Sequence, residues 1–154
     1  MKKILIIASL FFSLNASAIY RGPILAKYNS SGYVPPEWDR SERCELYFNK
    51  VVITKRFGRD TSVSETRDIE LKGSLTRILA AAQQEELLRE PNNLCDAPGT
   101  AIRGYMILPN DNVETVQLFN TGGCGSDSLN RSGPYSSMLK DLINNYCPTT
   151  HLPH

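Results

Sequence analysis

A hydrophobic segment at the N-terminus decides how much of the chain remains to fold and in which compartment it folds. Two lysines precede an apolar run over residues 4–14, and the Ala-Ser-Ala that ends at Ala18 places small residues where a signal peptidase cuts. The run falls well short of the roughly twenty apolar residues that span a bilayer. The pattern therefore predicts a bacterial signal peptide over residues 1–18, cleavage between Ala18 and Ile19, and export to the periplasm or the medium without a lasting membrane anchor.

Four cysteines follow the predicted signal: Cys44, Cys95, Cys124 and Cys147. An even number of cysteines in an oxidising compartment predicts disulfides, here two of them. The sequence has no Cys-x-x-Cys pair of the kind that zinc sites and thioredoxin-like redox centres use. The cysteines therefore favour a domain stapled by disulfides over a metal or redox centre, and no cofactor is expected.

The charge balance narrows the class of partner. The whole chain has 17 Lys and Arg against 16 Asp and Glu, and two of the lysines belong to the predicted signal. The remainder is close to neutral and lacks the clustered basic residues that neutralise nucleic-acid phosphates. We therefore expect a protein or a small ligand of the cell envelope as partner, and not a nucleic acid.

The first half of the exported chain predicts two strands and a helix after an irregular start. Residues 19–43 are rich in Gly, Pro, Ser and aromatic residues without a sustained period, which predicts an extended arm. Residues 46–57 are β-branched and aromatic, with a phase change that either a bulge near Asn49 and Lys50 or partial burial of both faces would explain. Residues 63–71 alternate between apolar and polar positions and predict a second strand. An apolar stripe behind Ser74, a capping residue type, predicts a helix to about residue 84 and a distorted turn between it and Pro91.

The second half predicts the same order of elements. The segments 101–108 and 113–120 read as strands, and the turn-rich residues between them favour a hairpin. A long polar loop follows. Pro134 then opens a stripe of apolar residues at helical spacing, which predicts a helix over residues 134–146. The residues after it, 148–154, are expected to form a flexible tail.

These elements predict an α+β domain over residues 44–147. The order strand, strand, helix occurs twice, and an antiparallel four-stranded sheet with both helices on one face would bury every apolar stripe. If each helix runs back antiparallel to the strand before it, Cys44 and Cys147 lie at one end of this sheet. Cys95 and Cys124 then lie at the other end. Because a disulfide needs α-carbons within about 7 Å, the predicted bridges join the members of each pair.

Two segments are candidates for binding. The most unusual local sequence is a glycine-rich loop whose backbone amides could converge on an anion, although a glycine-flanked disulfide loop has the same composition. Trp38 in the predicted arm offers an amphipathic ring of the kind that interfaces favour, although the arm's aromatic residues could instead pin it into grooves of the domain. The candidate binding residues are Gly122, Gly123, Gly125, Ser126, Asp127 and Trp38.

Catalytic groups are sparse. The only histidines, His151 and His154, lie in the last four residues, where a flexible tail does not position a general base. Carboxylate pairs such as Glu85 and Glu86 are explained by a solvated face, so a hydrolase that uses carboxylates alone is disfavoured. The sequence therefore predicts a non-catalytic binding or interaction domain. A secreted inhibitor of a hydrolase, such as a peptidase or a lysozyme, is the alternative.

Overall fold

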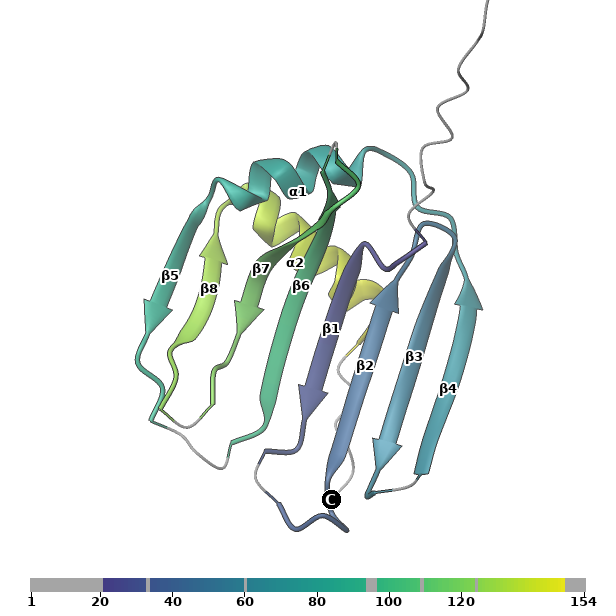
Figure 1. Cartoon of the computed structure of the whole chain (residues 1–154), viewed down its shortest axis with the longest axis vertical. Coiled ribbons are helices and arrows are strands. Elements are labelled where there is room, and N and C mark those ends of the chain that lie inside the picture. The colour runs from purple at the N-terminus through teal and green to yellow at the C-terminus, as the bar shows by residue number, and fades with distance from the viewer. Residues whose placement is uncertain are drawn as a thin grey trace, which may run out of the picture.

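The computed structural model describes residues 21–32, 34–59, 61–93, 97–108, 110–123 and 125–148. Within this part the chain forms one eight-stranded antiparallel sheet and two helices. Both helices lie against the same face of the sheet (Figure 1). The predicted signal peptide with its cleavage site, the predicted Cys95–Cys124 bridge and the tail from residue 149 lie outside the described residues.

The strands follow the order β4-β3-β2-β1-β6-β7-β8-β5 across the sheet. Their bounds are β1 Leu25–Ser30, β2 Arg40–Leu46, β3 Lys50–Phe57, β4 Thr61–Asp68, β5 Glu86–Glu90, β6 Gly99–Ile107, β7 Val113–Asn120 and β8 Ser128–Ser132. The helices are α1 Leu75–Gln83 and α2 Pro134–Tyr146. The first four strands form a meander, and the two halves of the sheet join where β6 pairs with β1. Strand β1 is therefore central.

The predicted four-stranded sheet is wrong, and part of the error lies in the segment predicted as an extended arm. That segment contains β1 and the start of β2. Leu25, Ala26 and Lys27 are consecutive and all buried. Leu25 and Lys27 face the helices, whereas the small Ala26 lies on the opposite face between Glu45 and Arg103 of the neighbouring strands. A strand buried on both sides does not alternate, and the lysine interrupts the apolar run that would otherwise have marked it.

The other missing strands have two causes. The predicted strand over residues 46–57 is split by a turn in which the Tyr47 amide donates to the Lys50 carbonyl. This turn, and not a bulge, produces the phase change. Strands β5 and β8 have five residues each, and none of their side chains is buried. They occupy segments predicted as a distorted turn and a loop, because a short strand that buries no side chain carries no apolar period.

The core fills the space between the helices and the sheet. The fully buried residues of the helices include Leu79 on α1 and Leu139 and Ile143 on α2. Helix α1 packs closely on β6, because a Cβ at Gly104 would lie 2.2 Å from the Leu79 Cδ2. Both helices begin and end within about one residue of their predicted bounds. Ser74 occupies the N-cap position of α1 but makes no side-chain capping bond.

A disulfide joins Cys44 to Cys147, with its α-carbons 6.0 Å apart. This is the first of the two predicted bridges. Cys44 does not lie at the start of a strand, however. It lies within β2 on the face that the helices cover, directly below the end of α2, and both cysteines are about 1% exposed. The bridge therefore ties the last helix to the N-terminal half of the sheet.

A carboxylate from the α1–β5 junction caps helix α2. The amides of Tyr135 and Ser136 each donate to a Glu85 carboxylate oxygen at 2.8 Å. Gly133 leaves room for this contact, since a Cβ there would lie 2.2 Å from the Glu85 Cδ. Arg131 fixes the same junction, because its guanidinium donates to the carbonyls of Gln83 and Glu85. The cap thus depends on a residue about fifty positions away.

We expect the Glu85→Gln variant to unfold about 1 kcal/mol more easily than the wild type at pH 7, the usual cost of losing a cap. Burial opposes ionisation of Glu85, but the hydrogen bonds from Ser136 and Tyr135 outweigh it and lower the pKa of this carboxyl. The stabilisation is therefore complete above the unfolded-state pKa, about 4.3, and is lost as the pH falls through the lower folded-state pKa.

Urea unfolding between pH 7 and pH 2 measures this dependence. The difference between the wild type and Glu85→Gln should shrink towards zero in acid. Glu86→Gln, a matched change at the exposed neighbouring residue, should cost little at any pH. A Glu85→Gln deficit that stays constant down to pH 2 would contradict a role for the ionised carboxylate.

Candidate functional site

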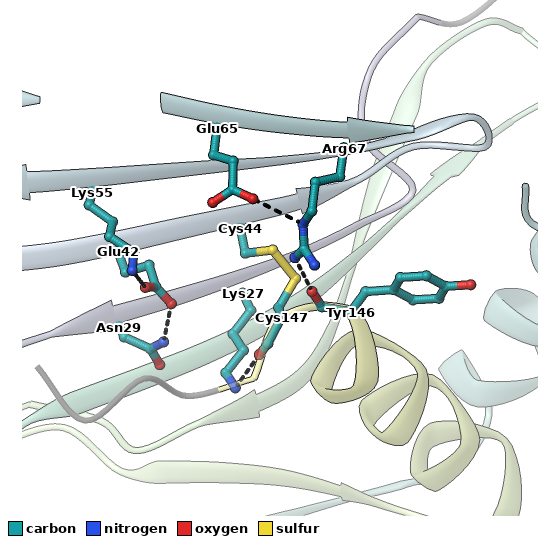
Figure 2. Close-up of polar contacts among 9 residues, drawn as sticks. All are labelled: Lys27, Asn29, Glu42, Cys44, Lys55, Glu65, Arg67, Tyr146 and Cys147. Atoms are coloured by element: carbon teal, nitrogen blue, oxygen red, sulfur yellow. Dashed lines mark hydrogen bonds and ion pairs between the residues drawn. A yellow bond between two sulfur atoms is a disulfide. The ribbon is translucent and has the colours of Figure 1, made fainter. Parts of the chain in front are cut away.

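A buried polar network lies between the sheet and the C-terminal end of α2 (Figure 2). The Lys27 Nζ donates to the Asn144 Oδ1 at 2.8 Å and to the Cys147 carbonyl at 3.1 Å. Burial lowers the pKa of Lys27, and the nearby Glu42 opposes this shift. Glu42 in turn forms an ion pair with Lys55 at 3.6 Å. The network holds the negative end of the helix dipole against the sheet.

The geometry of this network indicates a structural role. Lys27 and Glu42 are 3% and 4% exposed, and both are engaged on neighbouring elements. In the described part of the chain, no buried side-chain nitrogen or oxygen lacks a hydrogen-bond partner. A substrate would have to displace the end of α2 to reach the Lys27 amine. The opposite face of the sheet is more accessible.

The face of the sheet that lies away from the helices carries an aromatic and cationic cluster at its centre. The register places Arg43 of β2 directly opposite Tyr28 of β1, and Ala101 of β6 on the other side of the tyrosine. The guanidinium carbons of Arg43 and Arg103 lie 5.4 and 5.6 Å from the Tyr28 ring centroid. Two arginines on neighbouring strands therefore flank one tyrosine, and we call these three residues the Arg–Tyr–Arg stack.

Further contacts hold the stack in place. The Tyr28 and Tyr105 hydroxyls lie 3.2 Å apart, and Arg43 forms an ion pair with Glu45. Burial, with the hydrogen bond to Tyr28 as a second cause, raises the pKa of Tyr105. Cation–π contacts of this kind contribute about 0.5–1 kcal/mol each at exposed sites. The cluster is thus ordered before any ligand binds.

Arg103 differs from Arg43 in its electrostatic environment. Its side chain is exposed, and among the described residues no carboxylate lies within ion-pair distance of its guanidinium. Guanidinium groups donate through a planar fork that matches a carboxylate or a phosphate. The stack therefore presents one cation whose charge is not neutralised by a neighbour.

A shallow groove of about 560 Å³ continues from the stack towards the end of the sheet where β6 begins. Its charged and aromatic lining comes from Tyr28, Arg43 and Arg56, and from Glu42 at its margin. Hydroxyl groups also line it, from Ser30, Ser41, Thr54, Thr100 and Thr121. The groove thus combines basic groups with neutral hydrogen-bonding groups and has few apolar side chains.

Of the predicted binding residues, Gly122 lines this groove. Its amide already donates to the Asn120 Oδ1 at 3.1 Å, and the Gly123 amide donates to the Ser126 Oγ at 2.7 Å. Gly122 has a φ of +74°, and a Cβ there would meet the Asp127 carbonyl at 2.8 Å. These contacts give the glycines a role in closing a tight turn, and they leave neither of the two amides directed at an anion.

The remaining predicted residues lie apart from the stack. Gly125 also has a positive φ, of +73°, and belongs to the same turn. Trp38 is 61% exposed in the connection between β1 and β2, where its amide donates to the Pro35 carbonyl. It is not among the residues that line the groove.

A second groove, of about 570 Å³, lies between the two helices. Its lining is mainly aliphatic, with Leu71, Ile78 and the half-exposed Met138, and it includes the charges of Lys72 and Asp141. It offers apolar area, but none of the cation–π contacts found among the described residues involves a residue that lines it. The open face of the sheet is therefore the better-defined candidate site.

Sequence reasoning missed every member of the stack. Tyr28 fell in the predicted arm, and Arg43 stood just outside the predicted domain. The only sequence signal is that Arg43 and Arg103 are each followed, two residues later, by another member of the cluster, Glu45 and Tyr105 respectively. Residues two apart lie on the same face only if the segment is a strand, so this spacing does not identify a site until the strands are known. The stack also depends on the register of β1 with β2 and β6.

No family model, no curated protein and no solved structure matches the chain. Among the described residues there is no group of three or more His, Cys, Asp or Glu that could hold a metal ion. Neither of the two helices in this part of the chain is long and apolar enough to cross a bilayer. The candidate site therefore rests on the geometry of the open sheet face.

Proposed function

We propose that the protein is an exported, non-catalytic binding domain of the bacterial periplasm or medium, and that it binds an acidic surface of a partner protein through the open face of its sheet. The Arg–Tyr–Arg stack is the observation that carries this proposal. It places the exposed, unneutralised cation of Arg103 beside an aromatic ring at the centre of a face that no helix covers.

The composition of the stack suits protein recognition. Tyrosine and arginine are the residue types most enriched, with tryptophan, among those that dominate binding energy at interfaces. Each member projects from a strand in the middle of an eight-stranded sheet, so little backbone freedom is lost when a ligand binds. Preorganisation of this kind raises affinity because it reduces the ordering cost.

Electrostatics support a binding role over catalysis at this face. A general acid or base works best with a pKa near the operating pH. Tyr105, a half-buried titratable group of the cluster, has its pKa raised further from neutrality, so its hydroxyl stays protonated. The arginines are permanent cations. The cluster can hold an anion in place, but it offers no group poised to exchange a proton.

Export is supported by the signal pattern at the N-terminus together with the disulfide between Cys44 and Cys147. Disulfides persist in oxidising compartments and are rare in the reducing cytosol. In a compartment that keeps thiols reduced, this bridge between α2 and β2 would not persist and could not stabilise the fold.

Binding to a polyglutamate peptide, measured by fluorescence anisotropy at low salt, tests the site. We expect Arg103→Gln to weaken binding by about tenfold or more, the range of a charge-assisted hydrogen bond. Arg77→Gln is the matched control, since it removes the same charge from an exposed position on α1. Equal losses in both variants would show that the peptide responds to net charge alone and would refute the site.

A further inference from the structure

Strand β4 forms one edge of the sheet, and the proposed function does not use it. Its described side chains from Ser62 to Asp68 are all exposed, and Val63 keeps 57% of its surface accessible. Proteins usually protect such an edge with proline, a bulge, charged side chains or a very short strand. Strand β4 has eight residues, no proline and an unbroken register with β3, and the charges it carries are of both signs.

The hydrogen-bonding direction of β4 follows from its pairing with β3. The Ile69 amide donates to the carbonyl of Asn49, the residue that faces it when the register is extended by one position. Because paired and unpaired residues alternate along an antiparallel ladder, the odd-numbered residues of β4 bond to β3. The amides and carbonyls of Ser62, Ser64, Thr66 and Asp68 therefore point away from the sheet.

We infer that β4 pairs antiparallel with β4 of a second copy of this chain, in the register centred on Thr66. A two-fold pairing must set outward-pointing residues opposite each other, so its centre falls on a residue and not between two. Centred on Thr66, the pairing places Glu65 opposite Arg67 of the second copy, and the symmetry repeats this pair. It also places Val63 opposite Ile69 of the second copy, again twice.

The neighbouring registers lack this complementarity. Centring on Glu65 sets two glutamates opposite each other, and centring on Ser64 sets Val63 opposite Glu65. Like charges directly opposite each other are destabilising, whereas opposite charges stabilise the pair. The charges of β4 therefore select one of the sterically possible registers.

The side chains of Glu65 and Arg67 are positioned to form these ion pairs with a second copy. Within one chain the Arg67 Nε lies 3.4 Å from the Glu65 Oε1, and an Arg67 amino group donates to the Tyr146 carbonyl (Figure 2). Both side chains remain about half exposed or more, at 48% and 62%. In the proposed register they occupy pairs without backbone bonds, where side chains approach most closely.

The other edge of the sheet does not fit the same arrangement. Strand β5 has five residues, and the two-fold register that pairs all of them is centred on Leu88. That register places Glu86 opposite Glu90 of a second copy, twice, so the charges oppose self-pairing. We therefore assign self-association to β4 alone.

Sedimentation equilibrium on the mature chain, from micromolar to millimolar concentration, tests the inference. We expect a reversible dimer that weakens as salt is added, because exposed ion pairs are screened. Glu65→Arg and Arg67→Glu should each weaken it about tenfold or more, since two attractive pairs become two repulsive ones. The double variant, and an equimolar mixture of the two single variants, should both associate again.

A backbone variant separates strand pairing from other contacts. Thr66→Pro removes an amide that points to solvent, which an edge strand tolerates, so the fold should persist by circular dichroism while the dimer is lost. Glu86→Arg on β5 is the control and should leave the dimer unchanged. A monomer at millimolar concentration, a dimer that survives Thr66→Pro in a folded chain, or single variants that do not recover on mixing would each overturn the inference.

Discussion

Reduction of the Cys44–Cys147 disulfide is expected to lower the free energy of unfolding by up to about 5 kcal/mol. The two cysteines are separated by 103 residues, and a loop of about a hundred residues corresponds to roughly 4.7 kcal/mol of chain entropy in the unfolded state. The bridge also fixes the end of α2 above β2, where the Cys147 carbonyl accepts from Lys27. Its loss should therefore loosen the last helix before the rest of the sheet.

Urea unfolding with and without a reductant measures the effect. The comparison is cleanest in a chain that carries Cys95→Ser and Cys124→Ser, because reduction then acts on one bridge only. We also expect hydrogen exchange in α2 to accelerate more than exchange in β6 and β7. A change in the free energy of unfolding below about 1 kcal/mol would be well under the chain-entropy value and would contradict the role given to this bridge.

The second large effect is expected where α1 packs on β6. Leu79 is 1% exposed, and replacing it with alanine should cost about 2–5 kcal/mol through lost burial and a cavity. Gly104→Ala should cost about 1–3 kcal/mol for the opposite reason. The new methyl would lie 2.2 Å from the Leu79 Cδ2, so the buried Leu79 side chain must move out of its packed position.

The double variant distinguishes this packing from a general sensitivity of the core. When Leu79 is alanine, the methyl at position 104 enters the vacated space, so the double variant should be more stable than the sum of the single effects predicts. Additive losses in urea unfolding would mean that the two residues do not share one contact, contrary to the packing described.

The helices and the β6–β7 hairpin were predictable from the sequence because each carries a signal within its own residues. Helix α2 has Leu139 and Ile143 on one apolar stripe and Pro134 at its first position. The hairpin has two alternating segments around a turn. Local period and turn chemistry were sufficient for these elements, and tertiary packing did not oppose them.

The other half of the sheet was not predictable in the same way. Strand β1 buries Lys27 beneath α2, and that lysine is acceptable there only because Asn144 and Cys147 bind its amine. The residues near Lys27 in the sequence give no sign of these two partners, which lie more than a hundred residues away. The four-stranded prediction failed because the central strand depends on such long-range satisfaction.

The candidate site was hidden for a related reason. Tyr28 acquires its two arginines from β2 and β6, and the pairing of β1 with β6 joins segments about seventy residues apart. The glycine loop attracted attention because its composition is locally unusual, but Gly122 and Gly123 already use their amides within the turn. Unusual composition marked a turn, whereas ordinary strand residues formed the cluster.

Binding at the open sheet face is the central claim, and an NMR titration of the chain from Ile19 onward with a polyglutamate peptide tests it most directly. The Nε–H signals of Arg43 and Arg103 and the amides of β1, β2 and β6 should shift together and saturate. Signals from α1 and α2, including the Nε–H of Arg77, should stay in place. Shifts centred on the helices, or equal shifts at every exposed arginine, would contradict the claim.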